Sequence, residues 1–204
     1  MSDLQIPTRE LAIIQDELRV ALNLPGDVVE FGCYAGDTSV ELAKVMQDSI
    51  DKWLWLYDSF EGLPEKTAED NSSLGWRFKA GELKISPISV SAKFKKLKLP
   101  EPVIKKAWFD ALDPDADLPD QICFALLDGD FYKSIQTSLN LVAPKLAPGA
   151  TIVVHDYRNP ALPGSASPAK KPRRSSAERS PSACASSSRP ARKSRPLPPN
   201  SRAS

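Results

Sequence analysis

The stretch VVEFGCYAGDTS, residues 28–39, contains the junction that decides the fold. Its apolar start leads into Glu30, and Gly32 and Gly36 follow four positions apart. Asp37 then opens a segment whose apolar residues have helical spacing. A buried strand, a tight turn and a helix in this order predict a ligand site at the turn, because glycines let the backbone approach a bound molecule closely.

The same alternation of apolar strands and amphipathic helices continues along the chain to Asp156. Continuous apolar strands favour a parallel sheet that is covered by helices on both faces. We therefore predict an α/β fold with a Rossmann-like sheet. Helices are expected at 8–22, 37–50, 86–97 (starting at Ser86 and Pro87) and 135–146, the last ended by Pro148 and Gly149, and strands at 28–31, 53–58, 103–109, 122–128 and 151–156.

Acidic residues mark the ends of all five predicted strands. They lie at the last position of a strand or within one or two residues of it: Glu30, Asp58, Asp110, Asp128 and Asp156. Parallel sheets bind their ligands at the carboxyl ends of the strands. We therefore expect these five carboxylates to converge on one edge of the sheet, where the glycine turn also lies.

The glycine turn does not suit a nicotinamide dinucleotide. Tyr34 stands where the fingerprint needs a second glycine, and the Glu30 carboxylate would repel a pyrophosphate. A cofactor with a nucleoside and a cationic amino-acid end fits better, because the Asp58 carboxylate can accept hydrogen bonds from both ribose hydroxyls. S-adenosylmethionine (SAM) has these parts, and its positive sulfonium suits an acidic edge.

Six blocks between residues 25 and 157 carry a resemblance to a known family. In order they are VVEFGCYAGDTS (28–39), LYDSFEGLP (56–64), FKAGELKISPISVSAKF (78–94), KKAWFDAL (105–112), FALLDGDFYKS (124–134) and PKLAPGATIVVHDY (144–157). Together they resemble the macrocin O-methyltransferase family, whose members are class I SAM-dependent enzymes that methylate sugar hydroxyls in natural-product biosynthesis. The resemblance implies a methyltransferase that acts on a hydroxyl of a sugar or small secondary metabolite.

The resemblance also implies which residues bind SAM. The glycine turn and the end of the second strand would hold the cofactor, and an acid after the third strand would lie near the adenine. By position in this chain, these residues are Glu30, Gly32, Tyr34, Gly36, Ser39, Asp58, Ser59, Phe60 and Asp110.

A Mg²⁺ site is implied beside the cofactor. Its residues would be Asp128, with Asp130 near it, and the pair His155 and Asp156. His155 departs from the family, which commonly has a second Asp there, and an imidazole ligand favours softer metals such as Mn²⁺ or Zn²⁺. A bound Mg²⁺ can orient acceptor hydroxyls and lower their pKa. Asp128 and His155 are therefore the candidate catalytic residues, with His155 acting either as a metal ligand or as the general base.

The last 47 residues have a different composition from the rest. Residues 158–204 contain 11 lysines and arginines against the single Glu178, and no aromatic residue follows Tyr157. Such a segment buries too little apolar surface to offset its ordering entropy. We therefore predict a methyltransferase domain over residues 1–157 and a disordered basic tail over 158–204. The tail is either the product of a shifted reading frame or an arm that binds nucleic acid nonspecifically.

The number of predicted strands suggests an alternative in which the chain is not an enzyme. A class I methyltransferase sheet normally has seven strands, and only five precede the tail, so the two C-terminal strands are expected to be missing. The alternative function is therefore a truncated SAM-binding domain without catalysis, or a scaffold for the basic tail.

The cysteines and the hydropathy pattern concern the cellular setting. Cys33, Cys123 and Cys184 lie far apart, which favours unpaired thiols in a reducing cytoplasm. Neither a membrane span nor a signal peptide is expected from the apolar runs and the N-terminal residues. The expected partner is a small-molecule hydroxyl acceptor, and the resemblance also allows a homo-oligomer.

Overall fold

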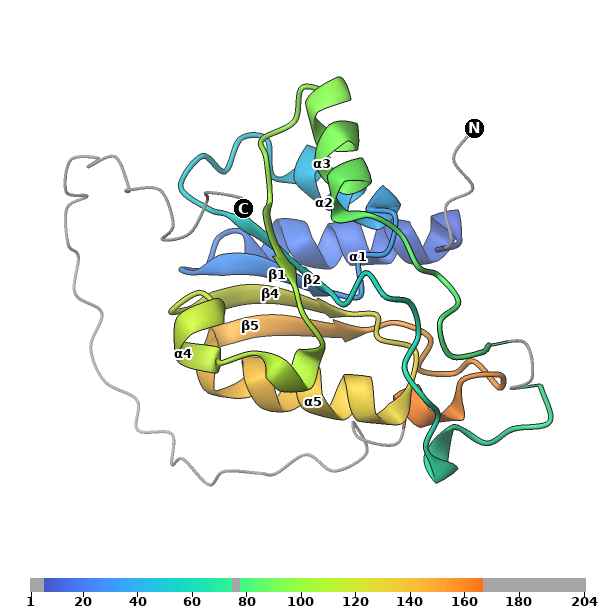
Figure 1. Cartoon of the computed structure of the whole chain (residues 1–204). Coiled ribbons are helices and arrows are strands. Elements are labelled where there is room, and N and C mark those ends of the chain that lie inside the picture. The colour runs from blue at the N-terminus through green and yellow to red at the C-terminus, as the bar shows by residue number, and fades with distance from the viewer. Residues whose placement is uncertain (1–5, 75–77, 167–204) are drawn as a thin grey trace, which may run out of the picture. The chain divides into compact units, whose positions relative to one another are not determined.

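The computed structural model describes residues 6–74 and 78–166, and both ranges belong to one compact unit. They form a parallel sheet of five strands in the order β3-β2-β1-β4-β5 (Figure 1). The predicted α/β fold is confirmed, and β1 lies at the centre of the sheet. The strands are β1 (Asp27–Phe31), β2 (Leu54–Asp58), β3 (Val103–Lys106), β4 (Ile122–Leu127) and β5 (Leu146–Val154).

Helices cover both faces of the sheet (Figure 1). On one face Phe94 of α3 packs in a core with Leu56 of β2, and on the other Ile135 of α5 packs in a core with Phe31 of β1. Within residues 6–74 and 78–166, no helix has the length and apolar character needed to cross a membrane. The helices are α1 (Thr8–Ala21), α2 (Asp37–Val45), α3 (Pro87–Lys96), the short α4 (Pro114–Asp117) and α5 (Tyr132–Val142).

Two elements are shorter than predicted. The helix α2 ends at Val45, and Ile50, the last residue of the predicted helix, is 72% exposed. Met46 is the last buried apolar residue of this segment, and turns beyond it lead the chain into β2. The strand β3 ends at Lys106, and Phe109 begins a 3-10 turn instead of ending the strand.

The fifth strand starts earlier than predicted. The helix α5 ends before Pro144, which has no amide hydrogen to donate. Leu146, predicted to be helical, already pairs with Ile122 of β4. Pro148 and Gly149 lie inside β5 near a shift of register, and Gly149 has φ +85°. These two residues therefore form an irregularity within the strand and not the predicted helix stop.

The described fold continues past Tyr157. The Ser165 hydroxyl donates a hydrogen bond to the Asp156 carbonyl at 2.7 Å. The 3-10 turn η5 (Pro163–Ala166) packs against α5 and the 3-10 turn η1 (Ala68–Asp70). Packed structure therefore extends beyond the predicted domain limit at residue 157, and residues 167–204 of the predicted tail lie outside the described residues.

Candidate cofactor and metal site

The glycine turn leads from β1 into α2 and lies against two neighbouring elements. Gly32 has φ +90°, and a Cβ on it would lie 2.1 Å from the Asp128 carbonyl oxygen, just after β4. Gly36 has φ +74°, and a Cβ on it would lie 2.8 Å from Val90 Cγ1 of α3. Both positions therefore require glycine, because any side chain would meet atoms that hold the turn in place.

Asp58, the last residue of β2, faces this turn. Its Oδ2 accepts a hydrogen bond from the Tyr34 amide at 2.8 Å, and its Oδ1 accepts one from the Phe60 amide at 2.7 Å. Burial raises the pKa of Asp58, and these backbone hydrogen bonds partly oppose the rise. Each carboxylate oxygen can accept a further hydrogen bond. The side chain is therefore held in a fixed position and can still bind the hydroxyls of a ligand.

The two residues after Asp58 have supporting positions. The Ser59 hydroxyl donates to the Gly62 carbonyl and accepts from the Glu61 amide, each at 3.1 Å. Phe60 is 1% exposed and packs in the core of the α1–α3 face. Ser59 therefore shapes the loop beside Asp58, and the side chain of Phe60 points away from any ligand at the strand ends.

Glu30 lies one residue before the end of β1 and is 1% exposed. Its Oε2 accepts a hydrogen bond from the Ser39 hydroxyl at 2.5 Å, whereas its buried Oε1 has no hydrogen-bond partner in the described residues. Burial raises the pKa of Glu30 to about 8; the Ser39 hydrogen bond opposes this rise, and the charges of Asp128 and Asp58 reinforce it. Glu30 is therefore largely protonated at neutral pH in this arrangement.

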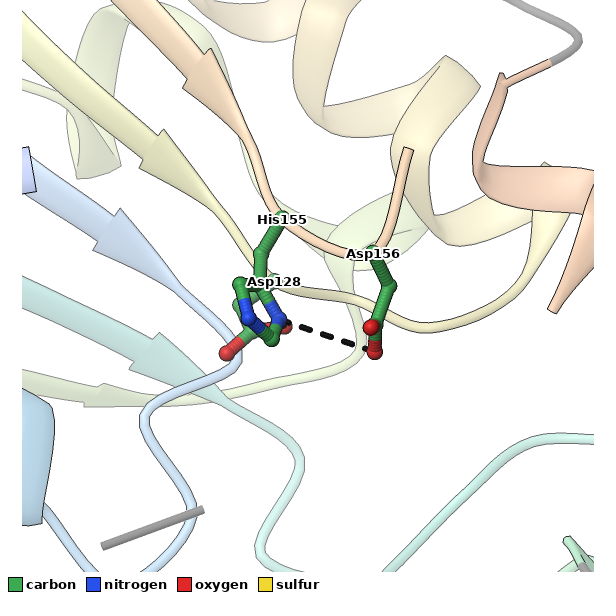
Figure 2. A group of neighbouring side chains, drawn as sticks. All are labelled: Asp128, His155 and Asp156. Carbon is green, nitrogen blue, oxygen red and sulfur yellow. Dashed lines mark hydrogen bonds and ion pairs between the residues drawn. The ribbon is translucent and has the colours of Figure 1, made fainter. Parts of the chain in front are cut away.

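The ends of β4 and β5 bring three candidate metal ligands together (Figure 2). Asp128 follows β4, and His155 and Asp156 follow β5. One ligand atom from each residue lies within 4.8 Å of the other two. His155 Nδ1 is 2.9 Å from Asp128 Oδ1 and 3.5 Å from Asp156 Oδ2. Two carboxylates and one imidazole nitrogen form a donor set that suits a divalent cation.

The imidazole of His155 has acids on both sides. Its Nε2 lies 3.3 Å from Glu10 Oε2 on α1 but makes no hydrogen bond within the described residues. Burial alone would lower the pKa of His155, but the hydrogen bond with Asp128 and the charges of Asp128, Asp156 and Glu10 outweigh burial and raise the pKa to about 9. The imidazolium form therefore predominates at neutral pH and balances part of the local negative charge.

Strained backbone surrounds the strand ends. Tyr34, Phe60, Asp130 and Asp156 have φ values of 43°, 55°, 61° and 54°. Positive φ is uncommon for residues other than glycine, and such strain concentrates at ligand-binding sites. Asp130, which was expected near the metal site, is half-buried, and desolvation together with the charges of Asp128 and Asp156 raises its pKa well above the usual range.

A cavity of about 470 Å³ lies at this edge of the sheet. Among the predicted site residues, the cavity is lined by Gly32, Tyr34, Asp58, Ser59, Asp110, Asp128 and His155. The other predicted residues, Glu30, Gly36, Ser39, Phe60 and Asp156, do not line it. Asp156 instead borders a second hollow between β5 and α1, which it shares with His155 and Glu10.

Asp110 has a partner that the sequence did not indicate. Its Oδ2 accepts a hydrogen bond from Lys133 Nζ of α5 at 2.8 Å, and this bond lowers the pKa of Asp110. Both side chains line the cavity and are more than half exposed, at 53% and 63%. The predicted adenine-side acid is therefore part of a surface ion pair at the opening.

The order of the five parallel strands, with the glycine turn after the central one and acids at the strand ends, defines the core of a class I methyltransferase fold. The model of the macrocin O-methyltransferase family (TylF) matches residues 9–174. The chain belongs to this family, as the resemblance predicted.

Two curated relatives are similar over most of the described region. A tetracenomycin-rhamnosyl 4'-O-methyltransferase of Streptomyces olivaceus is 30% identical over 148 residues, which are 69% of this chain and 56% of the relative. Demethyldecarbamoylnovobiocin O-methyltransferase of Streptomyces niveus is 28% identical over 143 residues, which are 66% of this chain and 54% of the relative. The chain therefore spans little more than half the length of these relatives.

Solved structures agree with the fold. The O-methyltransferase NovP superposes with a TM-score of 0.70 at 25% identity and covers 83% of this chain and 73% of its own. The calicheamicin methyltransferase CalS11 superposes with a TM-score of 0.67 over 83% of this chain and 78% of its own. At 18% identity, the second likeness concerns the fold alone.

Proposed function

We propose that this chain is a SAM-dependent O-methyltransferase that moves a methyl group to a hydroxyl of a sugar or small secondary metabolite, with assistance from a divalent metal. The observation that carries the proposal is that the glycine turn, Asp58 and two of the three candidate metal ligands, Asp128 and His155, line one cavity. The O-methyltransferase activities of the two curated relatives support the same reaction class.

The residues around the turn suit SAM. The Asp58 carboxylate is oriented by two amides and retains acceptor capacity for two ribose hydroxyls. The buried Glu30 Oε1 is an acceptor without a partner in the described residues, and the acids around it suit a cofactor with a positive sulfonium. When bound, SAM would supply an electrophilic methyl group, and these residues would fix where that group faces the acceptor.

The donor set at the ends of β4 and β5 suits a metal. Asp128, Asp156 and His155 Nδ1 would hold it, and the imidazole favours Mn²⁺ or Zn²⁺ over Mg²⁺ relative to a set of carboxylates alone. A metal in this position would lower the pKa of an acceptor hydroxyl, which is otherwise a poor nucleophile.

The geometry favours the ligand role of His155 over the general-base role. Its Nδ1 faces the carboxylates of Asp128 and Asp156, and its Nε2 faces Glu10. Neither nitrogen is left to take a proton from an acceptor in the cavity. As a ligand, His155 would give up the proton that Nδ1 shares with Asp128 Oδ1 at 2.9 Å, because a metal binds only the deprotonated ring nitrogen, and Asp128 would bind the same metal.

Two measurements on the full chain test the proposal. Calorimetry with S-adenosylhomocysteine should detect one site per chain. Transfer of labelled methyl from SAM to a panel of glycosides should fall at least tenfold after EDTA treatment and return when Mn²⁺ or Mg²⁺ is added. Activity that is indifferent to EDTA would reject the role of the metal. Binding of S-adenosylhomocysteine without any methyl transfer would favour the non-catalytic SAM-binding domain. Absence of binding would reject both the enzyme and the SAM-binding domain.

The cellular setting is proposed on the same basis. We infer a cytoplasmic protein with a small-molecule acceptor, and light scattering of the purified chain would reveal a homo-oligomer.

For residues 167–204, sequencing the gene around codons 158–170 in independent isolates would separate a shifted reading frame from a native basic tail. Filter binding at low and high salt would then test the tail for nonspecific contact with nucleic acid.

A further inference from the structure

The two nitrogens of the His155 ring face acids on different elements. Nδ1 lies 2.9 Å from Asp128 Oδ1 and 3.5 Å from Asp156 Oδ2, so it points into the candidate metal site (Figure 2). Nε2 lies 3.3 Å from Oε2 of Glu10, which belongs to α1. Glu10 is therefore outside the donor set but within reach of one of its three ligands.

The hollow between β5 and α1 brings Glu10 to the ring. Ile14 of α1 and Val153 of β5 line this hollow together with Glu10 and His155. The His155 side chain is only 10% exposed, whereas that of Glu10 is 55% exposed. Packing thus fixes the ring, and the carboxylate keeps its rotational freedom. The 3.3 Å contact is not aligned as a hydrogen bond within residues 6–74 and 78–166, and a rotation of the Glu10 side chain is enough to align it.

The other polar groups beside Nε2 suit it less well. The Asn159 side chain donates to Asp156 Oδ1 and accepts from the Ala161 amide, each at 3.0 Å. The guanidinium of Arg158, which also lines the hollow, has donors and no acceptor. Glu10 is therefore the acceptor that the fold places beside this nitrogen.

A histidine that binds a metal through one nitrogen carries its proton on the other. In metal sites that second nitrogen usually donates to a carboxylate, a backbone carbonyl or a water. The partner fixes the tautomer and the orientation of the ring, and it makes the ligating nitrogen more basic. The positions of Glu10, His155 and Asp128 have this arrangement, because the carboxylate on α1 and the donor set meet different ring nitrogens.

We propose that Glu10 is a positioning residue for His155: its carboxylate accepts the Nε2 proton, so that Nδ1 is free to bind the metal together with Asp128 and Asp156. This inference rests on the proposed metal-assisted function and adds a residue of α1 to that site. A carboxylate at position 155 has no ring proton to donate, so the role of Glu10 depends on the imidazole.

Mn²⁺ affinity of the full chain, measured by electron paramagnetic resonance, is the first test. Glu10→Ala should weaken binding by about tenfold to hundredfold, and Glu10→Gln, which keeps an acceptor oxygen, should lose less. Glu17→Ala removes the same charge at an exposed position of α1 outside both cavities and should bind like the wild type. Affinity for S-adenosylhomocysteine should not change in any variant. A Glu10→Ala variant that matches the Glu17 control would overturn the inference.

The ring itself can be observed, because His155 is the only histidine of the chain. After labelling with ¹⁵N-histidine, the imidazole signals belong to this residue alone. With diamagnetic Zn²⁺ bound, the wild type should show a metal-bound Nδ1 and a protonated Nε2 whose proton exchanges slowly with water. In Glu10→Ala that exchange should become faster, and Glu10→Gln should partly restore the slow exchange. Identical spectra for the wild type and Glu10→Ala would contradict a hydrogen bond between Nε2 and Glu10.

A double-mutant cycle separates this role from a general effect of negative charge. In a His155→Asp background, Glu10→Ala should leave Mn²⁺ affinity unchanged, since no ring remains to be positioned. An equal loss in both backgrounds would mean that Glu10 acts through its charge, and the inference would be wrong. A wild type that binds neither Mn²⁺ nor Zn²⁺ would reject the proposed metal and the inference together. Metal binding that is indifferent to Glu10 would reject the inference alone.

Discussion

The backbone of Gly32 lies directly against the carbonyl of Asp128, so that a Cβ on Gly32 would sit 2.1 Å from that oxygen. The Asp128 amide also donates to the Phe31 carbonyl at 2.8 Å, so β1 and β4 remain paired up to this point. The first residue of the glycine turn and the first candidate metal ligand are therefore held together by backbone contacts. A change at Gly32 or at Asp128 should therefore affect both the glycine turn and the candidate metal ligands.

Gly32→Ala should destabilise the protein and weaken cofactor binding together. The added methyl group forces the ends of β1 and β4 apart, which should lower the free energy of unfolding by about 3 kcal/mol. Urea denaturation and S-adenosylhomocysteine calorimetry measure the two effects. Gly81→Ala is the matched control, since Gly81 has φ +81° but no atom within 4 Å of its Cβ position. Equal losses in both variants would mean that backbone strain, and not the contact with Asp128, is responsible.

Asp58→Ala should abolish most of the affinity for S-adenosylhomocysteine. The change removes the acceptor for ribose hydroxyls and also for the Tyr34 and Phe60 amides, and hydrogen bonds to a charged group of this kind correspond to roughly tenfold to hundredfold in affinity. Asp58→Asn keeps one acceptor oxygen and should lose less. Asp120→Ala changes an exposed acid outside the cavity and should bind normally. Unchanged affinity in Asp58→Ala would exclude the ribose role.

The strand ends were the predictable part of the site. Buried parallel strands are continuous apolar runs, so their positions can be recognised locally. Asp58, Asp128 and Asp156 could then be placed on one edge because parallel strands end on the same side of a sheet. The limits of this reasoning appear at Pro148 and Gly149, since the residue types that stop a helix also suit an irregularity in a strand.

Other parts of the site depend on packing between distant segments. Glu65, Phe78 and Glu82 lie in the loop between β2 and α3, which has no periodic pattern to reveal which side chains face the cavity. Glu10 approaches His155 only because α1 packs against β5. Contacts of this kind follow from the assembled fold and have no local signal in the sequence.

His155→Asp should change which metal binds and leave the cofactor site intact. An all-carboxylate donor set favours Mg²⁺, so the ratio of Mn²⁺ to Mg²⁺ affinity should fall by about tenfold. Electron paramagnetic resonance of Mn²⁺, with Mg²⁺ as competitor, measures this ratio. His155→Ala removes the ligand altogether and should weaken both metals. If His155 were instead the general base, His155→Asp would lower methyl transfer while both metal affinities stayed the same.

Glu30→Gln should change how stability depends on pH. The pKa of Glu30 is raised from 4.5 to about 8 by burial. A carboxyl group with a raised folded-state pKa contributes stability below its unfolded pKa and loses that contribution as pH rises through the folded value. The glutamine stays neutral and still accepts from Ser39, so the stability of the variant relative to the wild type should rise by on the order of 4 kcal/mol from about pH 5 to pH 9. Urea denaturation at both pH values checks this, and parallel curves would contradict the raised pKa.

Asp70→Ala should loosen the segment that leads from Asp128 and Asp130 into α5. Asp70 is 2% exposed, and its Oδ1 accepts from the Tyr132 amide at 2.7 Å, at the start of α5 and two residues after Asp130. Gly164 packs against the same oxygen, so that a Cβ on Gly164 would lie 1.9 Å from it. The unpaired amide should cost about 2 kcal/mol in unfolding free energy. Glu69→Ala, at the exposed neighbour, should stay within about 0.5 kcal/mol of the wild type in the same urea titration. If the Asp70 variant is as stable as the Glu69 control, α5 keeps its first turn without the hydrogen bond from the Tyr132 amide to Asp70. That bond would then not be what holds Asp130 in place.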